Sequence, residues 1–393
     1  MIRLIRMQVA LLLLMGLALR ASSAPAEPVK ITFLLPLRGV IKDLALSTKE
    51  GFLLGLEEEA KAHQIDDWKS LIILDIRDSR TDPEHSLKMA KEAISEGSRA
   101  ILAGGSSKST LNIRDYVLNE AGVPLIVFTP TSSKLRIQHP LFIRPSRSIP
   151  LLSTALAHWL IDHIDKVRMT SETPASKPRW ACIHLDYSWG EGVCDGFTKA
   201  YGSVGEEVGR IPVEFKTLSK KKEIVKLTKL QPQPDFALVA ITGAEAETFF
   251  RDYYRFNVHK KIPPVALYVA VLPARLRAYE KTLGEHDTAA GLVTASAYEP
   301  TIDNPPNHYL VAQYKKKYEG KLPDALAMWG YDGARLLIKA LMQLDGKWDG
   351  AKVVELMKTL PYESPRHGKQ LKFDTHGDPI NPAHIQRTER DGD

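Results

Sequence analysis

The stretch ILAGGSSKST, residues 101–110, passes from an apolar run through two glycines to four hydroxyl residues placed around one lysine. The apolar run has the composition of a buried strand, and the residues from Thr110 onward have the pattern of a helix. A strand that turns directly into a helix is the repeating unit of a parallel α/β sheet. The stretch therefore raises two questions: how far this sheet extends, and what the hydroxyl groups of the turn bind.

The same alternation of strand and helix continues on both sides of this stretch and restarts near residue 180, after a polar loop at 167–178. Continuous apolar strands are typical of parallel sheets covered on both faces. We therefore predict an α/β fold with two open, doubly wound parallel-sheet domains, because roughly 365 residues after residue 26 exceed a single core. The predicted strands are residues 29–35, 71–76, 100–103, 125–128, 180–185, 207–212, 236–240, 265–269 and 292–295, and the predicted helices are 44–63, 82–95, 110–120, 191–201, 222–230 and 244–257.

The first 26 residues have the pattern of an export signal. Arg3 and Arg6 precede an apolar segment at 9–19, and Ala24-Pro25-Ala26 supplies the small residues that signal peptidase reads. The apolar segment is too short to span a bilayer, and no later stretch reaches the roughly 18 uncharged apolar residues that a span needs. We expect a periplasmic protein whose mature chain starts near Glu27 and has no membrane span.

The charge of the chain gives little support to a nucleic-acid partner. The formal net charge of +6 falls to +3 once the three arginines of the export signal are removed. The lysine runs at 220–222 and 315–317 lie in polar helical patterns, where a solvated face is the simpler interpretation. Basic residues do not alternate with aromatic ones as in nucleic-acid-binding proteins, so we expect no nucleic acid.

Cys182 and Cys194 are the two cysteines of the chain. An oxidising compartment permits a disulfide between the predicted strand and the helix after it, and two buried thiols are the alternative. Two cysteines at this spacing do not make a tetrahedral metal site. We expect no metal and no cofactor.

The opening stretch does not match two sequence motifs that are typical of enzymes. A phosphate-binding loop of the form G-x-x-x-x-G-K-[ST] requires glycines where Leu102 and Ser107 stand. A G-x-S-x-G serine elbow requires a second glycine where Ser109 stands, and no histidine has a recognisable acidic partner. We expect a protein without enzymatic activity; a hydrolase that loses activity in Ser107→Ala is the third-ranked hypothesis.

The position of the turn points to a binding site. Ligands of parallel sheets bind beyond the carboxyl ends of the strands, and the free N–H groups of a helix start suit a carboxylate. The next strand ends in a similar way, with TPTSS at 129–133, so two adjacent strand ends bring hydroxyls to one rim. Serine and threonine are also ordinary turn and cap residues, but the pair of turns together favours a site.

Nine segments in the same order carry a resemblance that runs from about Ile31 to Pro382. They are LLPLRG (34–39), EGFLLGLEE (50–58), RDSRTDPEHSLKMAKEAI (77–94), GGSSKST (104–110), AGVPLIVFTPTSSKL (121–135), FIRPSR (142–147), DYSWGEG (186–192), MWGYDGARLLIKAL (328–341) and GKQLKFDTHGDP (368–379). The chain resembles the leucine/isoleucine/valine-binding type of periplasmic solute-binding protein, which has the type I fold and serves ABC importers.

The resemblance implies roles for five ligand-binding residues. Ser107 matches a serine that bonds the ligand carboxylate, Thr131 a residue whose backbone does so, and Ser133 a threonine whose hydroxyl contacts the ligand. Trp189 and Thr242 match two positions at which an aromatic side chain contacts the ligand from the second domain.

The chain also departs from the family pattern at two positions. Leu44 stands where an aromatic residue of the first loop is usual, and Val269 falls close to the place of the acid that pairs with an α-ammonium group. Because a buried ammonium group without a partner carries a large penalty, ligands without an amine become candidates, among them small carboxylates, amides and aromatic acids. Asp186 or Glu245 are the alternative partners for an amine.

The resemblance implies a two-lobed receptor with a three-strand hinge. We place the crossings near Arg147, Ala297 and Ser364–Gly368, so that lobe one is 27–146 with 297–364 and lobe two is 147–296 with 365–393. The lobes would close around a small polar or carboxylate-bearing ligand, an amino acid or a related compound, which a membrane permease of an ABC importer would then accept. A periplasmic sensor of the same fold, signalling to a protein partner, is the alternative.

Overall fold

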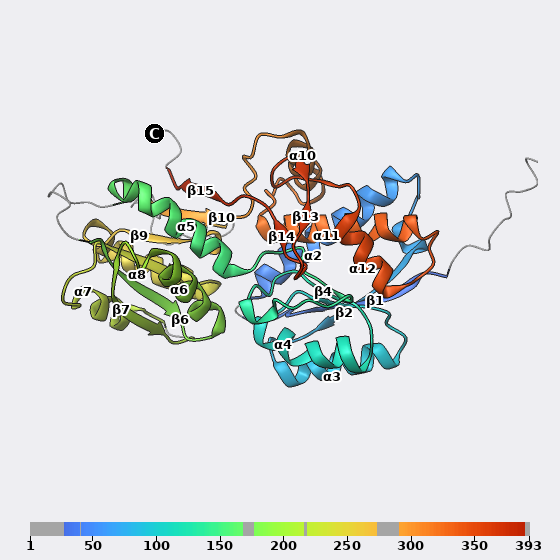
Figure 1. The fold of residues 1–393 in the computed structure, drawn as a ribbon, viewed down its shortest axis with the longest axis horizontal. Helices are drawn as coiled ribbons and strands as arrows, with labels where there is room; N and C mark the ends of the chain where they lie inside the picture. Colours follow the sequence, from blue (N-terminus) through green and yellow to red (C-terminus); the bar gives the residue numbers. More distant parts are fainter. Residues whose placement is uncertain (1–26, 40, 168–176, 216–217, 273–290, 390–393) are drawn as a thin grey trace, which may run out of the picture.

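The computed structural model describes residues 27–39, 41–167, 177–215, 218–272 and 291–389, and it contains two α/β lobes (Figure 1). The predicted export signal lies outside the described residues. Each lobe is built on one sheet of mainly parallel strands with helices on both faces. This confirms the predicted fold class.

The sheet of the first lobe has the strand order β2-β1-β3-β4-β5, and all its strands are parallel. Apolar residues of the strands pack with α2, α11 and α12 on one face and with α3 and α4 on the other. The elements are β1 (Val29–Leu35), α2 (Lys42–Ala62), β2 (Ile72–Asp78), α3 (Pro83–Ser95), β3 (Ile101–Ala103), α4 (Ser107–Asp115), β4 (Leu125–Val127), β5 (Phe142–Ile143), α10 (Pro305–Lys317), α11 (Ala325–Gln343) and α12 (Gly350–Thr359).

The sheet of the second lobe has the order β15-β10-β9-β8-β6-β7, in which β15 alone among these strands is antiparallel to its neighbour. Helices α5 and α6 cover one face, and α7 and α8 cover the other. The elements are α5 (Ile149–His163), β6 (Arg179–Leu185), α6 (Ser188–Tyr201), β7 (Glu206–Val213), α7 (Lys221–Thr228), β8 (Phe236–Ala240), α8 (Ala244–Arg255), β9 (Pro264–Leu267), β10 (Val293–Ser296) and β15 (His384–Arg387).

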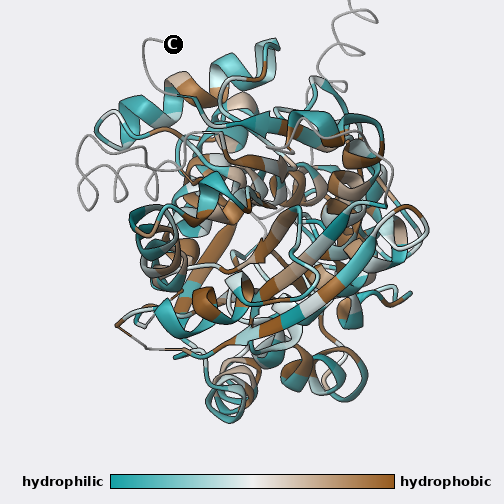
Figure 2. Cartoon of the chain, turned by 90° about the vertical axis from the view of Figure 1, so that its left-hand side faces the viewer, coloured by the Kyte–Doolittle hydropathy of each residue, from teal (hydrophilic) through white to brown (hydrophobic). Residues whose placement is uncertain are grey.

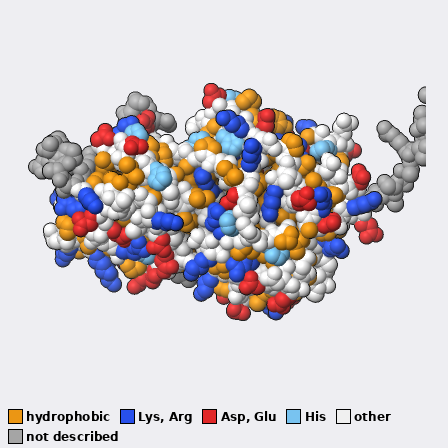
Figure 3. All heavy atoms as spheres, in the orientation of Figure 1, with side chains coloured by type: hydrophobic (Ala, Val, Ile, Leu, Met, Phe, Trp, Pro, Cys, Tyr) orange, Lys and Arg blue, Asp and Glu red, His pale blue; other side chains and the backbone are white. Residues whose placement is uncertain are grey.

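Hydrophobic residues gather on the strands and on the inner faces of the helices (Figure 2). On the face of the molecule drawn in Figure 3, basic and acidic side chains are interspersed, as expected of a solvated surface. Within the residues that the structure describes, no helix is both long and apolar enough to cross a bilayer.

Two element boundaries differ from the prediction near the candidate site. Helix α4 begins at Ser107 instead of Thr110, because the Ser106 side chain caps the helix by accepting a hydrogen bond from the Ser109 N–H at 3.1 Å. Strand β9 ends at Leu267, and a 3₁₀ turn at Tyr268–Ala270 follows it, so Val269 lies in this turn and not in the strand.

Cys182 in β6 and Cys194 in α6 form a disulfide, with their Cα atoms 6.0 Å apart. The sequence leaves open a disulfide or two buried thiols, and the structure contains the disulfide. The disulfide ties α6 to the strand before it, and α6 carries Trp189 in its first turn.

The chain passes between the lobes after β5, after β10 and before β15 (Figure 1). The third passage lies beyond the predicted Ser364–Gly368, because residues up to about 380 pack on the first lobe. The Arg144 N–H donates to the carbonyl of Gly377 at 2.9 Å, and the Arg144 Nε bonds the carboxylate of Asp378 at 2.5 Å. Leu371 joins the core of the first lobe, so residues 365–380 do not belong to the second lobe.

Candidate ligand-binding cavity

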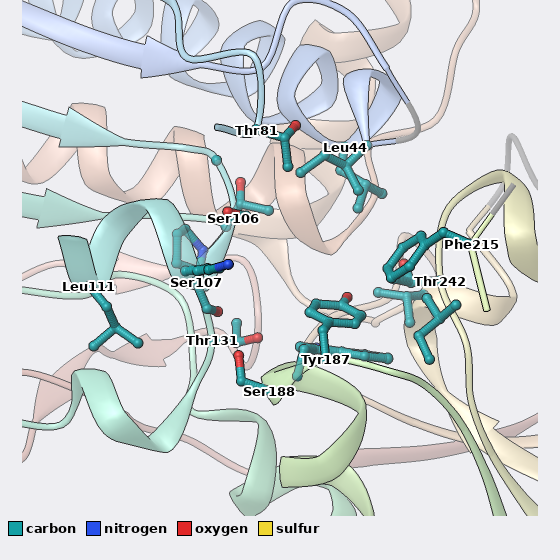
Figure 4. A pocket seen from close by; sticks show the side chains of 18 of the residues that line it. Leu44, Thr81, Ser106, Ser107, Leu111, Thr131, Tyr187, Ser188, Phe215 and Thr242 are labelled. Atoms are coloured by element: carbon teal, nitrogen blue, oxygen red, sulfur yellow. The ribbon is translucent and has the colours of Figure 1, made fainter. Parts of the chain in front are cut away.

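A cavity of about 520 Å³ lies between the two lobes, at the carboxyl ends of the strands of both sheets. Figure 4 shows residues of the first lobe on one side of this space and residues of the second lobe on the other. Its lining residues are Ile41, Leu44, Thr81, Gly105, Ser106, Ser107, Lys108, Leu111, Thr129, Pro130, Thr131, Lys134, Leu185, Asp186, Tyr187, Ser188, Trp189, Phe215, Thr242, Tyr268, Val269 and Leu326.

The first wall consists of the turns after β3 and β4. The turn after β3 is tight, because a side chain at Gly104 would lie 2.4 Å from Leu35. Ser107 follows it as the first residue of α4, is 5% exposed, and accepts a hydrogen bond from the Ser132 N–H at 3.3 Å. The hydroxyl hydrogen of Ser107 and the N–H groups at the start of α4 are therefore donors suited to an anionic group of a ligand.

The turn after β4 is linked to the first passage between the lobes. Thr131 is buried, and its carbonyl accepts a hydrogen bond from the Ile149 N–H at the start of α5, at 2.8 Å. The Thr129 hydroxyl lies 3.1 Å from the hydroxyl of Thr48 on α2. This wall is thus fixed by contacts with both α2 and α5.

The second wall is aromatic. The ring of Tyr187 lies 6.1 Å from the ring of Trp189 in a stacked arrangement and 5.5 Å from the ring of Phe215. Trp189 is 6% exposed and also belongs to the core around α5 and α6. Burial raises the pKa of Tyr187 well above its ordinary value, so its hydroxyl remains protonated at physiological pH. These rings suit a flat apolar ligand.

Thr242 lies beyond the end of β8, on the side of the cavity that faces Ser107 and Thr131 (Figure 4). It is 6% exposed, and its Oγ1 has no hydrogen-bond partner among the residues that the structure describes.

Charged side chains are confined to the exposed part of the lining. Lys108, Lys134 and Asp186 are the three charged residues of the lining, and all three are exposed. Glu245, an alternative partner for an amine, does not line the cavity, and its carboxylate pairs with the buried Lys220 Nζ at 2.5 Å. Among the described residues, the buried part of the cavity lining therefore contains no acidic side chain. In the same part of the chain, no three His, Cys, Asp or Glu side chains are grouped as metal ligands would be.

The structure brings four of the five predicted ligand-binding residues to the cavity: Ser107, Thr131, Trp189 and Thr242. Ser133 does not line it; it is exposed as the first residue of a 3₁₀ turn (Ser133–Leu135) that Ser132 caps. The departures Leu44 and Val269 both line the cavity as apolar residues.

Three aromatic residues of the second wall are absent from the sequence prediction. Tyr187 follows β6, Phe215 follows β7, and Tyr268 follows β9 directly. The rule that ligands bind beyond the carboxyl ends of parallel strands indicates all three positions once the strands are placed.

Fold and cavity together define a two-lobed α/β protein with a candidate ligand-binding cavity between its lobes. The chain belongs to the periplasmic binding protein family, because the model of this family matches residues 28–393. It is 24% identical, over 91% of its length and 87% of the relative, to Leu/Ile/Val-binding protein homolog 6 of Brucella abortus. The predicted resemblance is thereby confirmed.

Two solved structures share the fold at lower sequence identity. A solute-binding protein of an ABC transporter from Rhodopseudomonas palustris, in complex with 3,4-dihydroxybenzoic acid, is 22% identical with a TM-score of 0.78, and the match covers 92% of this chain and 93% of that one. The branched-chain amino acid transporter substrate-binding protein LivJ of Streptococcus pneumoniae, in complex with isoleucine, is 16% identical with a TM-score of 0.75, covering 92% and 97%. The fold is that of transport solute-binding proteins.

Proposed function

We propose that this protein is the periplasmic receptor of an ABC importer and that it takes up a small carboxylate with an aromatic body and no amine. One observation carries the ligand class: donors line one wall of the cavity, aromatic rings line the other, and the buried lining holds no acid. The protein binds and releases its ligand without chemical change, and a membrane permease is its partner.

The carboxylate would bind at the first wall. The start of α4 offers N–H groups and the Ser107 hydroxyl, and α4 has nine residues whose dipole favours a negative charge at this end. The exposed Lys108 and Lys134 of the lining add positive charge near this wall.

The body of the ligand would lie against Tyr187, Trp189 and Phe215. An α-ammonium group in this position would be buried without a carboxylate, since Asp186 is exposed and Glu245 pairs with Lys220. The Rhodopseudomonas relative, crystallised with a dihydroxybenzoic acid, supports an aromatic acid. The isoleucine complex of the Streptococcus protein supplies the competing ligand class, which the experiment below includes.

Residues of both lobes line the cavity, so a ligand binds the closed arrangement of the lobes more tightly than an open one. Binding therefore shifts the population toward the closed form, with the dihedral changes absorbed by the three passages between the lobes. A permease that recognises the closed form would accept loaded receptor in preference to empty receptor.

Isothermal titration calorimetry with four ligands tests the ligand class. Benzoate and benzamide differ in the carboxylate, while 3-phenylpropanoate and phenylalanine differ in the α-ammonium group. We expect benzoate to bind at least tenfold more tightly than benzamide, and 3-phenylpropanoate at least tenfold more tightly than phenylalanine. Tighter binding of phenylalanine, or of leucine over benzoate, would contradict the proposal.

The transport role needs a separate measurement. In cells that carry the matching permease and ATPase, removal of this protein should abolish uptake of the labelled carboxylate, and the ligand recovered from the purified protein should be chemically unchanged. Undiminished uptake would favour a sensory role, and a converted ligand would favour an enzyme.

A further inference from the structure

One fully buried hydroxyl of the second wall lacks a hydrogen-bond partner in the described part of the protein. Thr242 is 6% exposed, lines the cavity, and its Oγ1 has no partner. Buried polar atoms almost always have a partner, and leaving one without costs about 1–3 kcal/mol. A bound ligand would supply the missing partner of this hydroxyl.

Other hydroxyls of the lining are engaged within the protein. Ser106 caps α4, Ser107 accepts from the Ser132 N–H, and Thr129 pairs with Thr48. These three lie on the first wall, whereas Thr242 lies on the second. Thr242 therefore differs from them both in its side of the cavity and in its lack of a protein partner.

The surroundings of Thr242 place it beside the aromatic wall. It follows β8, which is a neighbour of β6 in the sheet, and Tyr187 follows β6. Figure 4 shows Thr242 on the same side of the cavity as Phe215 and Tyr187, across from Ser107 and Thr131. A flat ligand held at Ser107 by its carboxylate and flanked by these rings would direct its opposite edge toward Thr242.

We infer that the Thr242 hydroxyl hydrogen-bonds a polar substituent at the end of the ligand opposite the carboxylate. The preferred ligand is then a ring-hydroxylated aromatic carboxylate, and Thr242 is the residue that distinguishes it from the unsubstituted acid. The inference rests on the proposed function, because it presumes the carboxylate at the first wall. A site built to hydrogen-bond a ligand hydroxyl rejects the analogue without it, since the buried group is then left unpaired.

Two ligands and one substitution test the inference. The wild-type protein should bind 4-hydroxybenzoate at least tenfold more tightly than benzoate in titration calorimetry. Thr242→Val keeps the shape of the side chain and removes its hydroxyl, so the ratio between the affinities for the two acids should fall to near one. Thr242→Ser keeps the hydroxyl and should keep the preference.

A control variant and a stability measurement complete the design. Thr248→Val changes a threonine of α8 whose hydroxyl bonds the Ala244 carbonyl outside the cavity, and it should leave the affinity for both ligands unchanged. Without ligand, Thr242→Val should melt no lower than the wild type, since it removes an unpartnered buried hydroxyl. A lower melting temperature would reveal a structural partner and overturn the inference.

The outcomes separate the two proposals. If the wild type binds both acids and Thr242→Val weakens both equally or neither, the inference fails while the proposed ligand class stands. If the wild type binds neither acid but binds leucine, the ligand class and the inference fail together.

Discussion

Ser107 joins the two turns of the first wall. Its Oγ accepts a hydrogen bond from the backbone of the turn after β4, while its own backbone starts the helix after β3. Because the Ser107 Oγ accepts this hydrogen bond, its own O–H can still donate one to an anionic ligand. The neighbouring Ser106 cannot replace it, because its side chain caps α4.

We predict that Ser107→Ala weakens binding of benzoate at least tenfold. A hydrogen bond to a charged group is worth about 1.5–3 kcal/mol, which corresponds to a loss of roughly 10- to 150-fold. Titration calorimetry measures the change, and Ser133→Ala is the matched control, because Ser133 is exposed and does not line the cavity. Equal effects of the two substitutions would contradict the assigned role of Ser107.

Ser133 and Tyr187 illustrate which residues of the site can be predicted from the local sequence and which cannot. The motif around residues 129–133 correctly indicates a hydroxyl-rich strand end, but which of its hydroxyls faces the cavity depends on the 3₁₀ turn that begins after Ser132. Tyr187 and Phe215 lie at strand ends that the sequence does place, yet their rings form one wall because the sheet sets β6 and β7 side by side.

Among the elements, α6 connects the disulfide to the aromatic wall. Cys194 in its middle is bonded to Cys182 in β6, and Trp189 lies in its first turn. The bridge closes a short loop of the chain, with a sequence separation of 12. A cross-link of this span stabilises the folded state chiefly by restricting the unfolded chain.

We predict that the double substitution Cys182→Ala/Cys194→Ala lowers the free energy of unfolding by roughly 3 kcal/mol, the value expected for a loop of this size. Urea unfolding of the variant should match that of the wild type in the presence of a reductant, and ligand affinity should change little, because Trp189 remains in the first turn of α6. Unchanged stability in both measurements would show that the bridge does not form in solution.

Element boundaries divide into those that the sequence determines locally and those that it does not. The strand β1 is predicted at its exact bounds because five of the seven residues from Val29 to Leu35 are apolar and Pro36 follows directly. The start of α4 is displaced by three residues because several serines compete for the cap. The third passage between the lobes depends on the pairing of Arg144 with Asp378, residues 234 positions apart, which no local pattern records.

At the scale of the whole molecule, the passages between the lobes hold buried charges. The carboxylate of Asp332 on α11 accepts hydrogen bonds from Tyr362, Ser364 and Arg366, and Arg366 also donates to the carbonyl of Pro145 in the first passage. This network fixes the C-terminal segment against the first passage. The second passage carries a different group, Glu299, whose protonation state depends on its surroundings.

Glu299 lies between β10 and α10 and is half-buried. Burial is the main cause that raises its pKa to about 7, and the nearby carboxylate of Asp324 raises it further, while hydrogen bonds with Ser296 and Gln386 act in the opposite direction. Ser296 and Gln386 belong to the second sheet, and Asp324 caps α11 of the first lobe. Groups from both lobes therefore influence the pKa of Glu299.

We predict that the stability of the protein falls as the pH rises from about 4.5 to about 7, through the titration of Glu299. In this window the folded state keeps a proton that the unfolded chain has released, so unfolding becomes easier with each step in pH, and above the folded pKa the loss is complete. Glu299→Gln removes the titrating group and should flatten this part of the stability curve. At pH 8 the variant should be more stable than the wild type by roughly 1–3 kcal/mol, since one pKa unit corresponds to about 1.4 kcal/mol.

Urea unfolding at pH 5, 6, 7 and 8 measures the curve for both proteins, and Glu363→Gln provides the comparison, because Glu363 is an exposed glutamate on β11 (Glu363–Ser364). That control should keep the slope of the wild type. If Glu299→Gln and Glu363→Gln give parallel curves, then Glu299 does not hold its proton in the folded state, and the charge at the second passage is tolerated. A flattened curve for Glu299→Gln alone would instead show that the junction of the lobes disfavours a negative charge, so that the same carboxyl group links the pH to the stability of the two-lobed arrangement.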